Sequence, residues 1–145
     1  MAKEILKAET ESLGGFKVSC KARDCEFIID EPVKSGGTNA GMNPLETLLN
    51  ALGACMTIMA QSFASTKKIN LKSFKVELEG KIDTDRLNKK ANVKVGFSKI
   101  TANIHIKADN TTAEIQDFVD FIEKTCPVRD TIENAPKFET KIVTN

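Results

Sequence analysis

The sequence predicts one soluble globular domain that combines short antiparallel strands with helices. The chain has 145 residues, 41% of them hydrophobic and 28% charged, and this length is enough to bury a sizeable core. Apolar residues alternate in several short segments, as in half-exposed strands, and recur at helical spacing in two longer ones. No repeat or long linker divides the chain, so we expect a single domain over residues 1–145.

The N-terminal part is expected to form a small antiparallel sheet. Strand-like segments span residues 4–11, 16–21 and 25–29. Gly14-Gly15 and Arg23-Asp24 supply the two short connections between them. A glycine-rich, flexible loop is predicted over residues 32–42.

A long helix should follow this loop, from residue 44 to about residue 66. Asn43 is a candidate N-cap, because its side chain can accept hydrogen bonds from the first turn, and Pro44 suits the first helical position. Glu46, three residues after Asn43, occupies the capping-box position. Hydrophobic residues lie nearly all round the helix, so we expect it to be buried.

The remainder is predicted to contain a hairpin, two further helices and a final strand. Alternation predicts hairpin strands at residues 74–82 and 93–106, and one apolar face predicts a helix at residues 112–124. Cys126-Pro127 begins a short third helix, and residues 138–143 have the pattern of a strand.

Charge and composition exclude several classes of function. Lys and Arg number 21 against 20 Asp and Glu, without a basic stripe, so neither nucleic acid nor a membrane surface is an expected partner. The chain has no Trp, no Tyr and a single His, which excludes zinc sites built on several histidines and catalysis by tyrosine. We expect no cofactor. The N-terminus lacks a secretory signal and no segment could span a bilayer, which predicts a cytoplasmic protein.

Four cysteines therefore remain as candidates for chemistry. Cys55 lies midway along the long helix, where it is either a packed core residue or, beside Gly53, a thiol that another group approaches closely. Cys126 lies at a predicted helix N-terminus, where backbone N–H groups favour a thiolate, and by this criterion it is the better nucleophile. Lys124 and Arg129 could lower its pKa further.

The other two cysteines and the histidine are expected to be incidental. Cys20 and Cys25 could form a hairpin disulfide or half of a metal site, but no further ligands accompany them. His105 alternates with isoleucines in a predicted strand, which favours a surface or cross-strand position over a catalytic base.

Two motifs in order resemble the OsmC/Ohr family. Residues 41–46 (GMNPLE) lead into residues 48–55 (LLNALGAC), and residues 126–128 (CPV) follow much later. The resemblance covers essentially the whole chain. It implies an α+β, OsmC-like fold in which two subunits form an intertwined homodimer with active sites at the interface.

The resemblance also implies a thiol-dependent peroxidase that reduces organic hydroperoxides. Cys55 would attack the peroxide and become a sulfenic acid, and Cys126 would condense with it to a disulfide. A dithiol reductant, either a lipoylated protein or a thioredoxin-like protein, would reset the pair. Glu46 would act indirectly, because nine residues place it about 13 Å along the helix from Cys55.

The chain differs from the family pattern at two points. Leu45 follows the Asn-Pro pair, where the family's peroxidases have a glutamate, and no residue matches the family's arginine. Lys17, Arg23 and Lys34 are the cations available in the same region. Two alternatives follow: a non-catalytic dimer that binds a small hydrophobic or thiol ligand in an interfacial pocket, or a structural dimer whose cysteines are only packed.

Overall fold

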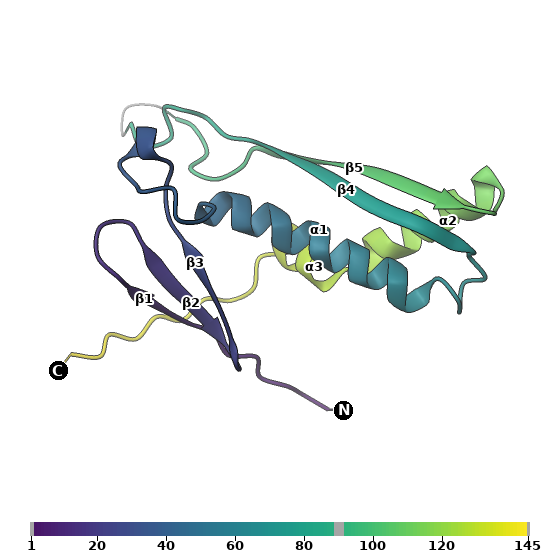
Figure 1. Cartoon of the computed structure of the whole chain (residues 1–145), viewed down its shortest axis with the longest axis horizontal. Coiled ribbons are helices and arrows are strands. Elements are labelled where there is room, and N and C mark those ends of the chain that lie inside the picture. Colours follow the sequence, from purple (N-terminus) through teal and green to yellow (C-terminus); the bar gives the residue numbers. More distant parts are fainter. Residues whose placement is uncertain (1, 89–91, 145) are drawn as a thin grey trace. The chain divides into compact units, whose positions relative to one another are not determined.

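The structure is a computed structural model that describes residues 2–88 and 92–144. Within these residues it contains three α-helices, a short 3-10 helix and five strands in two antiparallel sheets, which is an α+β arrangement (Figure 1). The chain divides into two compact units, one up to Leu49 and one from Asn50 onward. No helix in the described part of the chain is long and apolar enough to cross a membrane.

Three strands form the sheet of the N-terminal unit, in the order β1-β2-β3. They span Glu9–Ser12 (β1), Val18–Ala22 (β2) and Cys25–Ile29 (β3), so the prediction of three antiparallel strands is confirmed. The first strand begins later than predicted, at Glu9, because its partner β2 ends at Ala22 and offers no hydrogen-bonding groups beyond that point.

The loop after β3 is organised around the Asp30 carboxylate. This side chain accepts hydrogen bonds from the Thr38 hydroxyl and from the backbone N–H groups of Glu31, Thr38 and Ala40. The Thr38 hydroxyl has the largest effect, and together the hydrogen bonds hold the pKa of Asp30 well below its ordinary value. The loop also contains a 3-10 helix, η1, at Val33–Ser35, so the segment predicted to be flexible is held by specific contacts.

Gly41 lets the end of this loop pass close to β3. A Cβ atom at this position would overlap the backbone carbonyl oxygen of Ile28. The neighbouring Met42 carbonyl accepts a hydrogen bond from the Asp30 N–H at 3.2 Å. Backbone packing inside the N-terminal unit therefore requires the glycine that opens the GMNPLE motif.

The helix α1 spans Pro44–Phe63 and begins where the sequence predicts. The Asn43 Oδ1 atom accepts the Glu46 N–H at 2.8 Å, and the Glu46 Oε2 atom accepts the Asn43 N–H at 2.9 Å. Both halves of the capping box are thus formed, which confirms Asn43 as the N-cap. The helix ends three residues before the predicted position, and turns follow it.

The C-terminal unit combines the rest of α1 with a hairpin and two helices. Strands β4 (Leu71–Lys81) and β5 (Lys99–Ala108) pair antiparallel, and helices α2 (Thr112–Thr125) and α3 (Pro127–Glu133) follow. These elements are confirmed, but β4 begins three residues earlier than expected and β5 begins six residues later. Lys99 pairs with Lys81, the last residue of β4, and the Ser98 N–H donates to the Lys81 carbonyl at 2.9 Å, so the ladder ends where β4 ends.

The hydrophobic core of the C-terminal unit lies between α1, α2 and the hairpin, which runs alongside α1 in Figure 1. Met56 of α1 and Ile122 of α2 are completely enclosed. At Gly53 the helix passes so close to β4 that an added Cβ would lie 2.6 Å from the Leu78 Cδ1 atom. The absence of a side chain at Gly53 therefore allows α1 to pack tightly on the hairpin.

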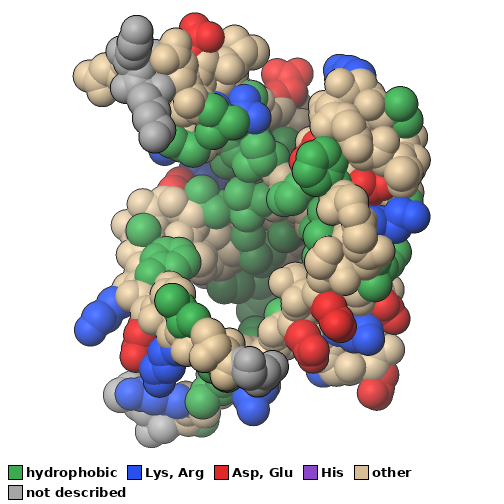
Figure 2. Space-filling model, turned by 90° about the vertical axis from the view of Figure 1, so that its left-hand side faces the viewer, with side chains coloured by type: hydrophobic (Ala, Val, Ile, Leu, Met, Phe, Trp, Pro, Cys, Tyr) green, Lys and Arg blue, Asp and Glu red, His purple; other side chains and the backbone are tan. Residues whose placement is uncertain are grey.

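Two predictions about apolar segments are wrong for the single chain. Residues 138–143 do not form a strand, because among the described residues no strand edge pairs with them, and they are exposed. The helix α1 is not buried all round: Ala51, Ala54 and Ile58 are exposed on one side, where no element of the C-terminal unit covers it. Figure 2 shows hydrophobic side chains at the surface of the molecule.

Candidate functional site

Cys55 and Cys126 meet in the C-terminal unit. Cys55 lies in the middle of α1, and Cys126 is the single residue between α2 and α3. Their Sγ atoms are 3.0 Å apart, and both cysteines are free thiols. A disulfide has an S–S distance of about 2.05 Å, so the sulfurs need to approach by only about 1 Å to become bonded.

Packing between α1 and α2 brings the two thiols together. The rings of Phe63 in α1 and Phe121 in α2 meet edge to face with centroids 5.2 Å apart. The Lys67 ammonium, just after α1, lies 4.2 Å from the centre of the Phe121 ring. These contacts, together with the shared core, fix where α2 ends relative to α1 and so place Cys126 beside Cys55.

The two thiols differ in their access to solvent. The Cys126 side chain is 1% exposed, whereas Cys55 is half-buried. Burial raises the pKa of Cys126, the contact with Cys55 raises it further, and the Arg129 N–H that donates to the Cys126 sulfur at 3.5 Å only partly opposes the rise in pKa. Desolvation therefore outweighs the helix N-terminus in setting the pKa of Cys126, contrary to the effect expected from the helix end alone.

Cys126 is consequently protonated at neutral pH and donates a hydrogen bond to the Cys55 sulfur. The pair is thus asymmetric. Cys126 is the buried member, and its thiol donates to the sulfur of the half-buried Cys55.

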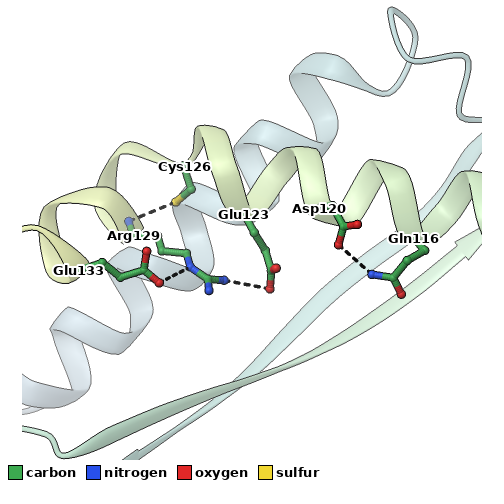
Figure 3. A network of polar contacts seen from close by, with 6 residues as sticks. All are labelled: Gln116, Asp120, Glu123, Cys126, Arg129 and Glu133. Atoms are coloured by element: carbon green, nitrogen blue, oxygen red, sulfur yellow. Dashed lines mark hydrogen bonds and ion pairs between the residues drawn. The ribbon is translucent and has the colours of Figure 1, made fainter.

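Arg129 ties the end of α2 to α3 (Figure 3). Its Nη1 atom lies 2.9 Å from the Glu123 carboxylate, and its Nε atom lies 2.8 Å from the Glu133 carboxylate. The hydrogen bond to Glu133, followed by that to Glu123, raises the pKa of Arg129. Sequence reasoning expects its charge near the thiol, but it is the backbone N–H of Arg129 that contacts Cys126.

Sequence reasoning missed Glu123 and Glu133. The spacing from Arg129 to Glu133 is the i, i+4 spacing of helical ion pairs and is visible in the sequence. The Glu123 contact crosses from one helix to the next and has no such local signal.

The other residues proposed for the site lie in the N-terminal unit. Glu46 completes the capping box of α1 with Asn43, as described above. Lys17, Arg23 and Lys34 belong to the same unit. A role for Glu46 or for any of these cations beside Cys55 stays a prediction.

The remaining cysteines and the histidine occupy positions in the sheets. Cys20 lies opposite Phe27 and Cys25 lies opposite Ala22, so the two cysteines are not cross-strand partners. His105 is exposed, and its Nε2 atom lies 3.1 Å from Glu77 on the neighbouring strand, which confirms a surface cross-strand histidine. Among residues 2–88 and 92–144, no three acidic, His or Cys side chains gather in a metal-binding arrangement.

A pocket of about 490 Å³ lies between α1, the start of β5 and α3. Its apolar lining includes Leu52, Met56 and Ile132, and Arg129 and Glu133 contribute polar groups. Because Leu52 and Met56 flank Cys55 along α1, the pocket lies within the same region of the C-terminal unit as the thiol pair.

The fold and the site define an α+β protein with a closely spaced dithiol. A family model described as OsmC-like protein matches residues 37–141, and the chain belongs to this family. The matched region contains both Cys55 and Cys126.

Two curated relatives and one solved structure resemble the chain over most of its length. A protein of Mycoplasma genitalium named hydroperoxide reductase is 29% identical over 124 residues, which is 86% of this chain and 85% of that protein. A Mycoplasma pneumoniae protein of the same name is 26% identical and covers 81% of this chain and 80% of its own length. The crystal structure of an OsmC-like protein from Mycoplasma pneumoniae superposes with a TM-score of 0.80 at 21% identity, covering 92% and 91% of the two chains.

Proposed function

We propose that the chain is a thiol-dependent peroxidase that reduces organic hydroperoxides. The observation that carries the proposal is the 3.0 Å separation between a half-buried thiol and a buried one. Relatives that carry the name hydroperoxide reductase support a peroxidase-type role in general. The assignment of steps to Cys55 and Cys126 is our own.

In the first step, the Cys55 thiolate attacks the peroxide oxygen that carries hydrogen. The O–O bond breaks, Cys55 becomes a sulfenic acid, and the alkoxide leaving group takes a proton to become an alcohol. In the second step, the Cys126 sulfur attacks the Cys55 sulfur. The S–O bond breaks, a disulfide forms, and the Cys126 proton leaves with the hydroxyl group as water.

A dithiol reductant then restores both thiols by two exchange reactions and is itself oxidised to a disulfide. We propose a lipoylated protein or a thioredoxin-like protein as this reductant. The cycle requires thiols to be kept reduced between turnovers, which is consistent with a cytoplasmic protein.

We also propose that the protein acts as a homodimer. Ile58 in α1 is 64% exposed, with Ala51 and Ala54 exposed on the same side of the helix. Phe138 and Ile142 near the C-terminus are more than 80% exposed. A second copy of the chain would remove this apolar surface from water.

The proposal is tested with purified protein, cumene hydroperoxide and dithiothreitol, with loss of peroxide as the readout. With dithiothreitol we expect wild-type turnover and no turnover for Cys55→Ser. Pre-reduced Cys126→Ser, assayed after removal of dithiothreitol, should consume one equivalent of peroxide and accumulate a sulfenic acid. Cys25→Ser is the matched control, because Cys25 is an exposed thiol outside the site. A wild-type protein as inactive as Cys55→Ser would refute the peroxidase.

The second candidate function is non-catalytic binding of a small hydrophobic or thiol ligand. The pocket of about 490 Å³ with apolar side chains from α1 and α3 favours it. An inactive wild-type protein whose melting temperature rises with an apolar thiol such as octanethiol would support this function.

A further inference from the structure

We propose that Arg129 is a positioning residue that holds Cys126 against Cys55 by joining α2 to α3. A role of Arg129 in turnover rests on the proposed function. Its effect on the geometry of the Cys55–Cys126 dithiol is independent of that function. A redox equilibrium between the two thiols can therefore test it without any peroxide.

The junction between the helices consists of one residue. Cys126 is at once the C-cap of α2 and the N-cap of α3, with extended backbone angles of φ −70° and ψ 110°. A rotation about φ, the N–Cα bond of Cys126, turns its side chain together with α3, whereas a rotation about ψ moves α3 alone. The position of the sulfur therefore depends on what fixes the angle between the helices.

Core burial anchors the two helices unequally. Phe118 and Ile122 of α2 are buried, whereas α3 has no fully buried residue and contributes only partly buried side chains such as Val128 and Ile132 to the core. A seven-residue helix with so little burial needs another contact to hold its orientation.

Arg129 supplies that contact from the first turn of α3. Its Nη1 atom reaches back across the junction to Glu123 in the last turn of α2, and Glu133 holds the Nε edge of the same planar group. Two carboxylates on one guanidinium fix its direction, which a lysine ammonium would not achieve in the same way. The Arg129 side chain is only 34% exposed, so solvent screens these pairs less than at an open surface.

The same residue also contacts the sulfur. The Arg129 N–H donates to the Cys126 Sγ atom at 3.5 Å, so the side chain holds α2 while the backbone holds the thiol (Figure 3). Loss of the ion pair would free α3 to turn and take Cys126 away from Cys55. A displacement of about 1 Å between reacting groups is enough to cost up to a hundredfold in rate.

The experiment measures the equilibrium in which oxidised dithiothreitol converts the Cys55–Cys126 dithiol to a disulfide and is itself reduced to the dithiol. All variants carry Cys20→Ala and Cys25→Ser, so that only the site thiols react. We expect Arg129→Ala and Glu123→Gln each to lower the equilibrium constant about tenfold, which corresponds to about 30 mV. The equilibrium constant of Arg129→Lys should lie between that of Arg129→Ala and that of the protein with only the Cys20→Ala and Cys25→Ser substitutions.

The control is Lys124→Ala, next to Glu123. Lys124 is a cation that lines the same surface pocket as Arg129, and its loss should leave the equilibrium constant unchanged. Circular dichroism and melting curves identify any variant that fails to fold. If Arg129→Ala does not fold, the test rests on Glu123→Gln and Arg129→Lys.

Unchanged constants in Arg129→Ala and Glu123→Gln would overturn the positioning role, as would an equal fall in Lys124→Ala. A tenfold fall in a protein that does not turn over hydroperoxide would support the positioning role and refute only the peroxidase.

Discussion

Cys126 is almost completely enclosed, while Cys55, whose sulfur lies 3.0 Å from the Cys126 sulfur and 71 residues earlier in the chain, is half-buried. Helix ends alone would rank the two thiols in the opposite order. The burial of Cys126 keeps its proton in place, so the proton serves as a hydrogen-bond donor to the neighbouring sulfur. This asymmetry leads directly to two measurable properties.

Alkylation should distinguish the two thiols in the native reduced protein. We expect iodoacetamide at pH 8 to modify Cys55 at least tenfold faster than Cys126, because Cys126 is enclosed and its pKa is raised, and only the thiolate is alkylated. Mass spectrometry of peptides after timed quenching gives both rates. Cys25, which is exposed, is the internal control for reagent activity. Equal rates at the two positions would contradict the asymmetry.

The stability of the reduced protein should fall at alkaline pH because of Cys126. Its pKa is raised in the folded state, so the folded chain keeps a proton that the unfolded chain has lost. The contribution of this thiol is therefore complete below the ordinary thiol pKa and is lost as the pH rises through the folded-state value. Urea unfolding from pH 7 to 10 should show a steeper loss for wild type than for Cys126→Ser, and parallel curves would refute the prediction.

Gly41→Ala should destabilise the protein by about 1–3 kcal/mol, the usual cost of forcing atoms into a well-packed site. The new Cβ would overlap the Ile28 carbonyl oxygen, which belongs to the backbone and has little room to move. Gly96→Ala is the matched control, because a Cβ there meets nothing within 4 Å. Urea unfolding of both variants measures the difference, and equal stabilities would argue against the close approach.

Ile58→Asp should convert the proposed dimer to monomers. A carboxylate at this exposed apolar position of α1 would have to be desolvated inside an interface. Sedimentation equilibrium measures the association, and Ala113→Asp, at an exposed position of α2, is the control. A wild-type protein that stays monomeric at all concentrations would contradict the dimer.

The helices and most strands were predicted well from local sequence patterns, because the hydrogen bonds that begin and end them join residues close together in the chain. The capping box joins Asn43 and Glu46, which are three positions apart, and both of its hydrogen bonds form. The failed strand at residues 138–143 shows the limit, since alternation describes a segment but says nothing about whether a partner strand exists.

The site was less predictable, because its chemistry depends on contacts between distant segments. Cys55 and Cys126 were singled out from their helix contexts and the family resemblance. The burial that raises the pKa of Cys126 comes from packing between α1 and α2, which no local pattern records. The Glu123–Arg129 pair crosses a helix junction and was missed for the same reason.

The one-residue junction between α2 and α3 limits which insertions and deletions the chain can accept. One residue added or removed within the last turn of α2 would turn everything after it by about 100° about the helix axis. Cys126 would then face away from α1, and Arg129 would lose Glu123, although every side chain of the site was still present. The close approach of the two thiols therefore requires a fixed number of residues between Ile122 and Arg129, as well as the two cysteines themselves.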